Sequence, residues 1–202
     1  MNNSGPAPFT LRSAAGLSMS PPEIGEAALV IIDAQDEYGP GGRLELPGLP
    51  AALDRIEDLL SRAREKGATI VHVVHRGNAG GLFDPATGGK VLSQVTPMPG
   101  EKIVDKTLPN SFAGTDLEEH LRNLGNPPLI LAGFMTHMCV SSTARAALDL
   151  GLSTTIAADA TATRPLPAPL QDEPVSAHDL QRASLAALAD RFSLVTETRS
   201  LA

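Results

Sequence analysis

Residues 28–33 read ALVIID and residues 68–75 read ATIVHVVH, and these two runs decide the fold. Both are short, apolar and rich in β-branched residues, which is typical of strands buried on both faces of a parallel sheet. Further strands are expected in four short runs, at 102–106, 129–133, 153–158 and 193–196. Helical stretches lie between them, at 49–66, 115–123, 136–150 and 176–191. The alternation predicts an α/β fold, a Rossmann-like three-layer sandwich with a six-stranded parallel sheet flanked by helices.

The boundaries of the expected helices carry signals of their own. Thr115 with Glu118 three residues later matches a capping box, and Gly67, Gly125 and Gly151 follow helices where a left-handed residue is favoured. We therefore expect a helix to begin at Thr115.

The chain divides into a tail, a domain and two irregular loops. Residues 1–25 are rich in Ser, Pro, Gly and Ala and predict a flexible N-terminal tail, whereas 26–202 predict one domain. Within it, 76–100 and 160–174 are punctuated by Gly and Pro. Such long loops are either lids and binding loops or mobile connections.

Charge and hydropathy exclude several classes of protein. The 202 residues include 16 Lys and Arg against 23 Asp and Glu, a net charge of −7, and no basic run. We therefore expect no nucleic-acid partner and no anionic membrane surface. No apolar stretch approaches the roughly 18 residues of a membrane span, and the start lacks the features of a secretory signal. A cytoplasmic location is expected.

Three reactive side chains fall where a parallel sheet binds its ligands, beyond the carboxyl ends of the strands. Asp33 closes the first strand, Lys106 closes the third, and Cys139 lies in the first turn of the helix after the fourth. Taken singly, they could be a cap, a solvated charge and a small core residue. Together they predict a nucleophile, because an ammonium and a helix start favour the thiolate and a carboxylate accepts its proton.

Three segments carry a resemblance to a known family: ALVIIDAQDEY at 28–38, VDKTLPNSFAGTDLEEHL at 104–121, and LILAGFMTHMCVSSTARAALDLG at 129–151. The chain resembles the isochorismatase-like cysteine hydrolases, which include nicotinamidases, N-carbamoylsarcosine amidases and related amide hydrolases. The resemblance covers about Ala28 to Val195 and makes 26–202 an isochorismatase-like hydrolase domain. It implies a catalytic triad of Asp33, Lys106 and Cys139, the strand order 3-2-1-4-5-6, and a homodimer or homotetramer.

The resemblance also implies an oxyanion hole. The family has a non-proline cis peptide that falls, by motif position, between Phe134 and Met135. It would let the backbone N–H groups of Met135 and Cys139 converge on a developing oxyanion near the thiol.

Departures from better-known members narrow the expected substrate. True isochorismatases hydrolyse a vinyl ether without relying on a cysteine nucleophile, so Cys139 favours an amide or ureido C–N bond. Metal-binding nicotinamidases add an Asp and His cluster after the first strand, whereas here no histidine precedes His72. We therefore expect no metal and no cofactor, and a cysteine hydrolase that acts on a small amide through a thioester. The alternatives are a nicotinamidase-type or isochorismatase-type hydrolase, or a non-catalytic α/β module that binds a small ligand.

The substrate pocket is expected to be apolar and partly aromatic. Its candidate residues are close to the three motifs or in the first long loop: Gln35, Tyr38, His75, Phe83, Phe112, Phe134 and Thr136. The alternatives are packing roles for Phe112 and Phe134, a helix cap for Thr136, and a solvated turn position for Gln35.

Overall fold

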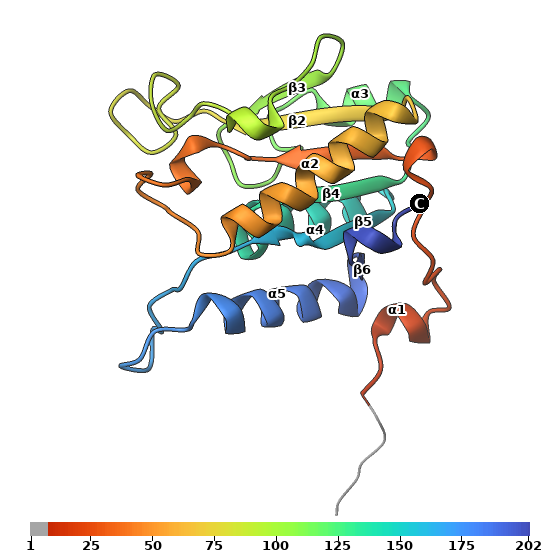
Figure 1. The fold of residues 1–202 in the computed structure, drawn as a ribbon. Helices are drawn as coiled ribbons and strands as arrows, with labels where there is room; N and C mark the ends of the chain where they lie inside the picture. Colours follow the sequence, from red (N-terminus) through yellow and green to blue (C-terminus); the bar gives the residue numbers. More distant parts are fainter. Residues whose placement is uncertain (1–7) are drawn as a thin grey trace, which may run out of the picture.

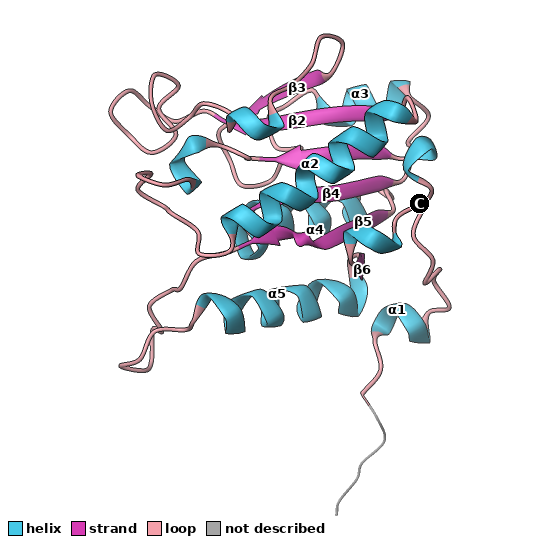
Figure 2. Cartoon of the chain, in the orientation of Figure 1, coloured by secondary structure: helices cyan, strands magenta, loops and turns pink. Residues whose placement is uncertain are grey.

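Residues 8–202 are described by a computed structural model, which shows a sheet between two layers of helices (Figures 1 and 2). The sheet has six strands, all paired in parallel, in the order β3-β2-β1-β4-β5-β6. The strands are β1 (Ala28–Ile32), β2 (Thr69–His75), β3 (Lys102–Lys106), β4 (Leu129–Phe134), β5 (Thr154–Ala162) and β6 (Leu194–Thr196). The predicted fold class and strand order are confirmed.

The helices cover the two faces of the sheet unequally. They are α1 (Leu11–Ala14), α2 (Leu49–Glu65), α3 (Leu117–Asn123), α4 (Ser141–Asp149) and α5 (Ala177–Arg191). Leu29 and Ile31 of β1 belong to the core cluster that contains the buried side of α2, whereas Val30 and Ile32 belong to the cluster with α3, α4 and α5. Both faces of β1 are therefore buried, as its uninterrupted apolar run predicts.

Two predicted boundaries are wrong. The helix expected at Thr115 begins at Leu117, because the Thr115 hydroxyl donates to the Ser111 carbonyl at 2.6 Å and forms no capping box. Strand β5 ends at Ala162, inside the segment predicted as the second loop, and its pairing with β4 shifts register between Leu131 and Gly133.

Part of the segment predicted as a flexible tail contacts the domain. Helix α1 lies against α5, and the Leu11 N–H donates to Asp190 Oδ1 at 2.9 Å. Ile24 is buried, and its N–H donates to the Ala202 carbonyl at 2.8 Å. The rest of the predicted tail, residues 1–7, lies outside the described residues.

Across residues 8–202, no helix is both long enough and apolar enough to cross a membrane.

Candidate active site

The three reactive side chains meet at the carboxyl edge of the sheet. Asp33 follows β1, Lys106 is the last residue of β3, and Cys139 lies in a π-helical turn, Thr136–Val140, between β4 and α4. Lys106 Nζ is 2.7 Å from Asp33 Oδ2 and 3.4 Å from Cys139 Sγ. Residues 106 positions apart in the sequence thus form one compact constellation.

The constellation is almost closed to solvent. The side chains of Asp33 and Lys106 have no exposed surface, and Cys139 is 5% exposed. Removing two charges from water costs several kcal/mol per ion, and a close ion pair with further hydrogen bonds offsets that cost. The ammonium has three N–H donors, and three acceptors lie near it: Asp33, Cys139 and His75 Nδ1 at 3.3 Å.

The carboxylate and the thiol have opposite tasks in proton transfer. Burial raises the pKa of Asp33, although the Lys106 charge opposes the shift, so this carboxylate is a stronger base than an exposed one. Burial and the negative charge of Asp33 raise the pKa of Cys139 to about 12, again against Lys106. This shift opposes the predicted preference for a resting thiolate, because burial and the Asp33 charge together outweigh the Lys106 ammonium. A raised pKa favours a thiol with a base beside it.

The backbone around the nucleophile is unusual at several points. Asp33 has φ +50°, a left-handed conformation that few non-glycine residues adopt, and the Phe134–Met135 peptide bond is cis. The Met135 carbonyl accepts from Met138 N at 3.0 Å and Val140 N at 3.3 Å, so the helix opens with a π-helical turn instead of the predicted α-helix. Such turns occur often at functional sites.

His75 lies beside the triad in its neutral form. Burial and the Lys106 charge lower the pKa of His75 to about 4. At neutral pH its Nδ1 can therefore accept from the Lys106 ammonium. His75 was predicted as a pocket residue, and the structure places its ring next to Lys106.

Three of the predicted pocket aromatics form one cluster near the triad. The Tyr38 ring makes edge contacts with Phe83 and Phe134, at centroid distances of 5.3 and 5.8 Å, and the His75 ring lies 4.9 Å from Phe83. Burial and the charge of Asp33 raise the pKa of Tyr38. Phe112 is not part of this cluster, because it packs on the opposite face of the sheet with the cluster that contains Cys139.

Gln35 and Thr136, which are predicted pocket residues, form hydrogen bonds to the backbone in the structure. The buried Gln35 amide donates to the carbonyls of His75 (2.9 Å) and Gly89 (2.7 Å) and accepts from His75 N–H (2.9 Å). The buried Thr136 hydroxyl donates to the Ala162 carbonyl at 3.1 Å. Both side chains are buried and bonded to the backbone, so neither is a helix cap or a solvated turn residue.

Two further polar residues near the site, Glu37 and His137, were not selected from the sequence. Glu37 is buried and accepts from Phe83 N–H at 2.8 Å, which fixes the first loop over the end of β1. His137, two residues before the nucleophile, is hydrogen-bonded through Nδ1 to Thr163, while its Nε2 is buried without a partner among residues 8–202. Their only sequence signal is position, next to Tyr38 and Cys139.

No group of three or more His, Cys, Asp and Glu side chains gathers as a metal-binding cluster within the described part of the chain.

Comparison with known proteins assigns the family. The profile of the isochorismatase domain matches residues 27–200, so the chain belongs to the isochorismatase family of hydrolases.

Individual relatives differ in what their names say. The secreted isochorismatase effector Isc1 of Verticillium dahliae is 37% identical over 95% of this chain and 98% of its own length. A streptothricin hydrolase of Streptomyces noursei is 38% identical over 83% of this chain and 61% of its own. A ureidoacrylate amidohydrolase, RutB of Azorhizobium caulinodans, is 27% identical over 67% of this chain and 76% of its own. The crystal structure of an isochorismatase from Pseudomonas putida matches with TM-score 0.91 and 39% identity, over 96% of this chain and 100% of that one.

Proposed function

We propose that this protein is a metal-independent cysteine hydrolase that cleaves the C–N bond of a small amide or ureido compound through a thioester intermediate. The proposal rests on one observation, the Lys106 ammonium 2.7 Å from Asp33 Oδ2 and 3.4 Å from Cys139 Sγ. A base, a thiol and a fixed positive charge in contact are the parts that acyl transfer to sulfur requires.

In the first half-reaction, Asp33 accepts the Cys139 proton as sulfur forms a bond to the carbonyl carbon. The carbonyl π electrons move to oxygen, and the backbone N–H groups of Met135 and Cys139 are proposed to bind the oxyanion. When the tetrahedral species collapses, the C–N bond breaks and the leaving nitrogen takes the proton from Asp33. An amine or ammonia departs, and the acyl group remains on sulfur.

In the second half-reaction, Asp33 accepts a proton from a water molecule as the water oxygen attacks the thioester carbon. The C–S bond then breaks, and the sulfur recovers a proton from Asp33. The Lys106 ammonium keeps the charge of the site balanced, because its positive charge faces a carboxylate in one state and a thiolate in the other.

Substrate contacts are proposed for side chains that lie near the triad. The aromatic cluster of Tyr38, Phe83 and Phe134 supplies an apolar wall, and His137 Nε2 supplies an unpartnered polar group near the nucleophile. Relatives named for streptothricin and ureidoacrylate hydrolysis support a substrate with a C–N bond.

The absence of a metal from the mechanism is part of the proposal. It is supported by the occupied histidines, since His72 Nε2 lies 2.8 Å from Glu101 and His75 Nδ1 lies 3.3 Å from Lys106. Dialysis against a chelator should leave turnover unchanged, and loss of activity restored by a metal would overturn this part.

An isochorismatase-type reaction is the second candidate, because the Verticillium and Pseudomonas relatives carry that name. The deciding experiment screens small amides, ureides and nicotinamide for ammonia or amine release, and isochorismate for vinyl ether cleavage. We expect a C–N substrate and, in an acid-quenched reaction, a mass adduct of the acyl group on Cys139. Turnover of isochorismate that survives Cys139→Ala would instead establish the second candidate.

Location and assembly also stay proposals. We propose a cytoplasmic homodimer or homotetramer that acts on a small molecule without nucleic acid or membrane. One relative is described as secreted, so cell fractionation is the test of location. Light scattering on the purified chain tests assembly.

A further inference from the structure

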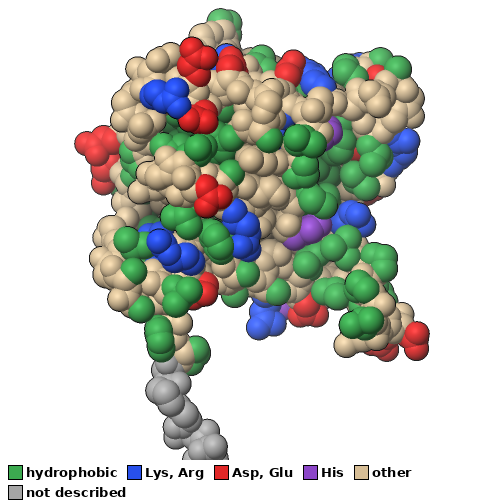
Figure 3. All heavy atoms as spheres, turned by 180° about the vertical axis from the view of Figure 1, so that it is seen from behind, with side chains coloured by type: hydrophobic (Ala, Val, Ile, Leu, Met, Phe, Trp, Pro, Cys, Tyr) green, Lys and Arg blue, Asp and Glu red, His purple; other side chains and the backbone are tan. Residues whose placement is uncertain are grey.

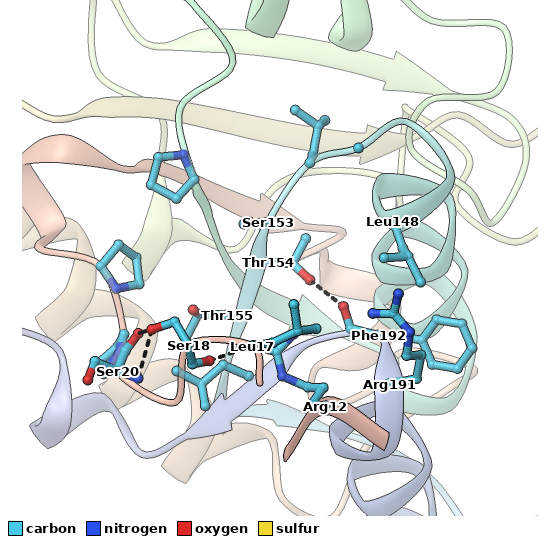
Figure 4. A pocket seen from close by; sticks show the side chains of 16 residues that line it. Arg12, Leu17, Ser18, Ser20, Leu148, Ser153, Thr154, Thr155, Arg191 and Phe192 are labelled. Carbon is cyan, nitrogen blue, oxygen red and sulfur yellow. Dashed lines mark hydrogen bonds between the residues drawn. The ribbon is translucent and has the colours of Figure 1, made fainter. Parts of the chain in front are cut away.

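A cavity of about 520 Å³ lies at the end of the sheet opposite the triad (Figure 4). Its walls are Pro128 before β4, Ser153 and Thr154 at the start of β5, the end of α5, and residues 12–22 of the N-terminal segment. A strand of six residues spans roughly 20 Å, so the cavity is separated from the catalytic thiol by the length of β4. Its volume is within the range of small-molecule sites.

Two arginines line the cavity, and neither has a carboxylate partner among residues 8–202. Arg12 and Arg191 are 179 positions apart in the chain and both contribute to the wall. Neither forms an ion pair anywhere in residues 8–202. The nearest acid in sequence, Asp190, accepts from the Leu11 N–H instead. In a chain of net charge −7, two unpaired guanidinium groups on one cavity need an explanation.

The donors of Arg12 are only partly used. Its Nη2 donates to the Ser18 carbonyl at 2.9 Å, which holds the side chain in place, while its Nε is buried with no partner in the described part of the chain. Arg12 and Arg191 line the same cavity, and burial together with the Arg191 charge lowers the pKa of Arg12. An anion between them would relieve both the desolvation and the repulsion.

The rest of the wall is mainly apolar, with a few hydroxyls. Leu17, Leu148, Phe192 and Leu194 supply hydrocarbon, and Figure 4 shows Leu17 and Phe192 on either side of the arginines. The Thr154 hydroxyl is already bonded to the Phe192 carbonyl at 3.2 Å. On the surface seen in Figure 3, basic side chains lie among hydrophobic ones close to where the grey tail begins.

We propose that this cavity is a binding site for a small organic carboxylate with an apolar body, held by Arg12 and Arg191. The planar guanidinium matches a carboxylate in geometry, and the hydrocarbon wall takes the body of the ligand. The net charge of −7 repels a doubly charged phosphate more strongly at long range than a singly charged carboxylate. The N-terminal segment and the end of α5 would be tied together by the ligand.

The test measures binding of 3-phenylpropionate to the full-length protein by calorimetry, with the neutral alcohol 3-phenylpropanol and with phenyl phosphate as comparisons. We expect saturable binding of the carboxylate and affinity at least about tenfold lower for the alcohol. Arg12→Gln and Arg191→Gln should each weaken binding by about tenfold, and more when combined. Arg199→Gln is the matched control and should bind as the unchanged protein does, because Arg199 is exposed and paired with Glu197.

Several results would overturn the site. In the unchanged protein, a lack of saturable carboxylate binding would overturn the proposal. Equal affinity for the carboxylate and the alcohol would also overturn it, and neither measurement requires a variant. Unchanged affinity in folded Arg12→Gln and Arg191→Gln would place the ligand elsewhere on the protein. Binding of phenyl phosphate in preference to 3-phenylpropionate would overturn the carboxylate assignment. Circular dichroism checks that each variant is folded.

Discussion

The two ends of the sheet differ in how their charges are paired. At the carboxyl end, Lys106 and Asp33 have no exposed side-chain surface and lie 2.7 Å apart. At the amino end, Arg12 and Arg191 line a cavity without a carboxylate partner among the described residues. A buried pair that balances itself is suited to moving a proton within the protein, whereas an unbalanced pair is suited to an anion from outside.

The physical cause of the difference is the way each end is built. The triad residues are held by strand ends, a buried Gln35 amide and a π-helical turn, so their geometry is fixed before a substrate arrives. The amino-end cavity is closed by the short N-terminal segment, which rests on α5 through few contacts. Preorganised positions favour catalysis.

The largest effect is expected at the catalytic end, from Cys139→Ala. It removes the nucleophile, so hydrolysis should fall by about three orders of magnitude or more while the fold persists. Ammonia release on the substrate found in the screen measures it. Met138→Ala, in the same turn but 39% exposed, is the control and should retain activity. Comparable turnover by the Cys139 variant would remove the triad from the mechanism.

The next effect tests the buried pair itself. Lys106→Met leaves the Asp33 carboxylate buried and unpaired, so the free energy of unfolding should fall by about 3–5 kcal/mol in urea titrations. The protein that carries both Asp33→Asn and Lys106→Met should lose less unfolding free energy than the protein with Lys106→Met alone. Arg191→Gln at the amino end should change stability by no more than about 0.5 kcal/mol. Equal losses at both ends would contradict the difference in charge balance.

The site at the carboxyl end of the sheet is predictable from the sequence, whereas the cavity at the amino end is not. The apolar runs at 28–33 and 68–75 determine buried strands, and a reactive residue at the end of a strand lies at the ligand-binding edge. Asp33, Lys106 and Cys139 could therefore be grouped before any coordinates. The amino-end cavity could not, because Arg12 and Arg191 meet only when the N-terminal segment folds back across α5.

Polar residues inside the site were the least predictable. Gln35 and Glu37 look like turn residues in AQDEY, yet both are buried because Gly89 and Phe83, some fifty positions later, supply backbone partners. The pKa of Cys139 was expected to be low from the ammonium and the helix start. Its rise to about 12 depends on burial beside Asp33, which a sequence does not encode locally.

A third prediction compares two glycines, one at each end. Gly133, just before the cis peptide bond, has φ +113°, and a Cβ there would lie 2.0 Å from the Ile32 carbonyl oxygen. Gly133→Ala should therefore destabilise the protein by about 3 kcal/mol, through backbone strain and overlap with β1. Gly151, which lines the amino-end cavity, has φ +75° and open space around it. Gly151→Ala should cost only about 1 kcal/mol, and thermal denaturation of the two proteins tests this ranking.

The smallest effect concerns His75 and the dependence of stability on pH. Burial and the Lys106 charge lower the pKa of His75 to about 4 in the folded protein, whereas an unfolded histidine titrates near 6.5. Between these values the unfolded chain binds more protons, so stability rises with pH. The contribution is fully present above about pH 6.5 and is lost as the pH falls through about 4.

His75→Gln, which removes this titration, should flatten the curve of unfolding free energy across that window. His178→Gln, the same substitution at an exposed histidine, is the control. An equal slope in the His75→Gln and unchanged proteins would show that His75 is not held neutral beside Lys106.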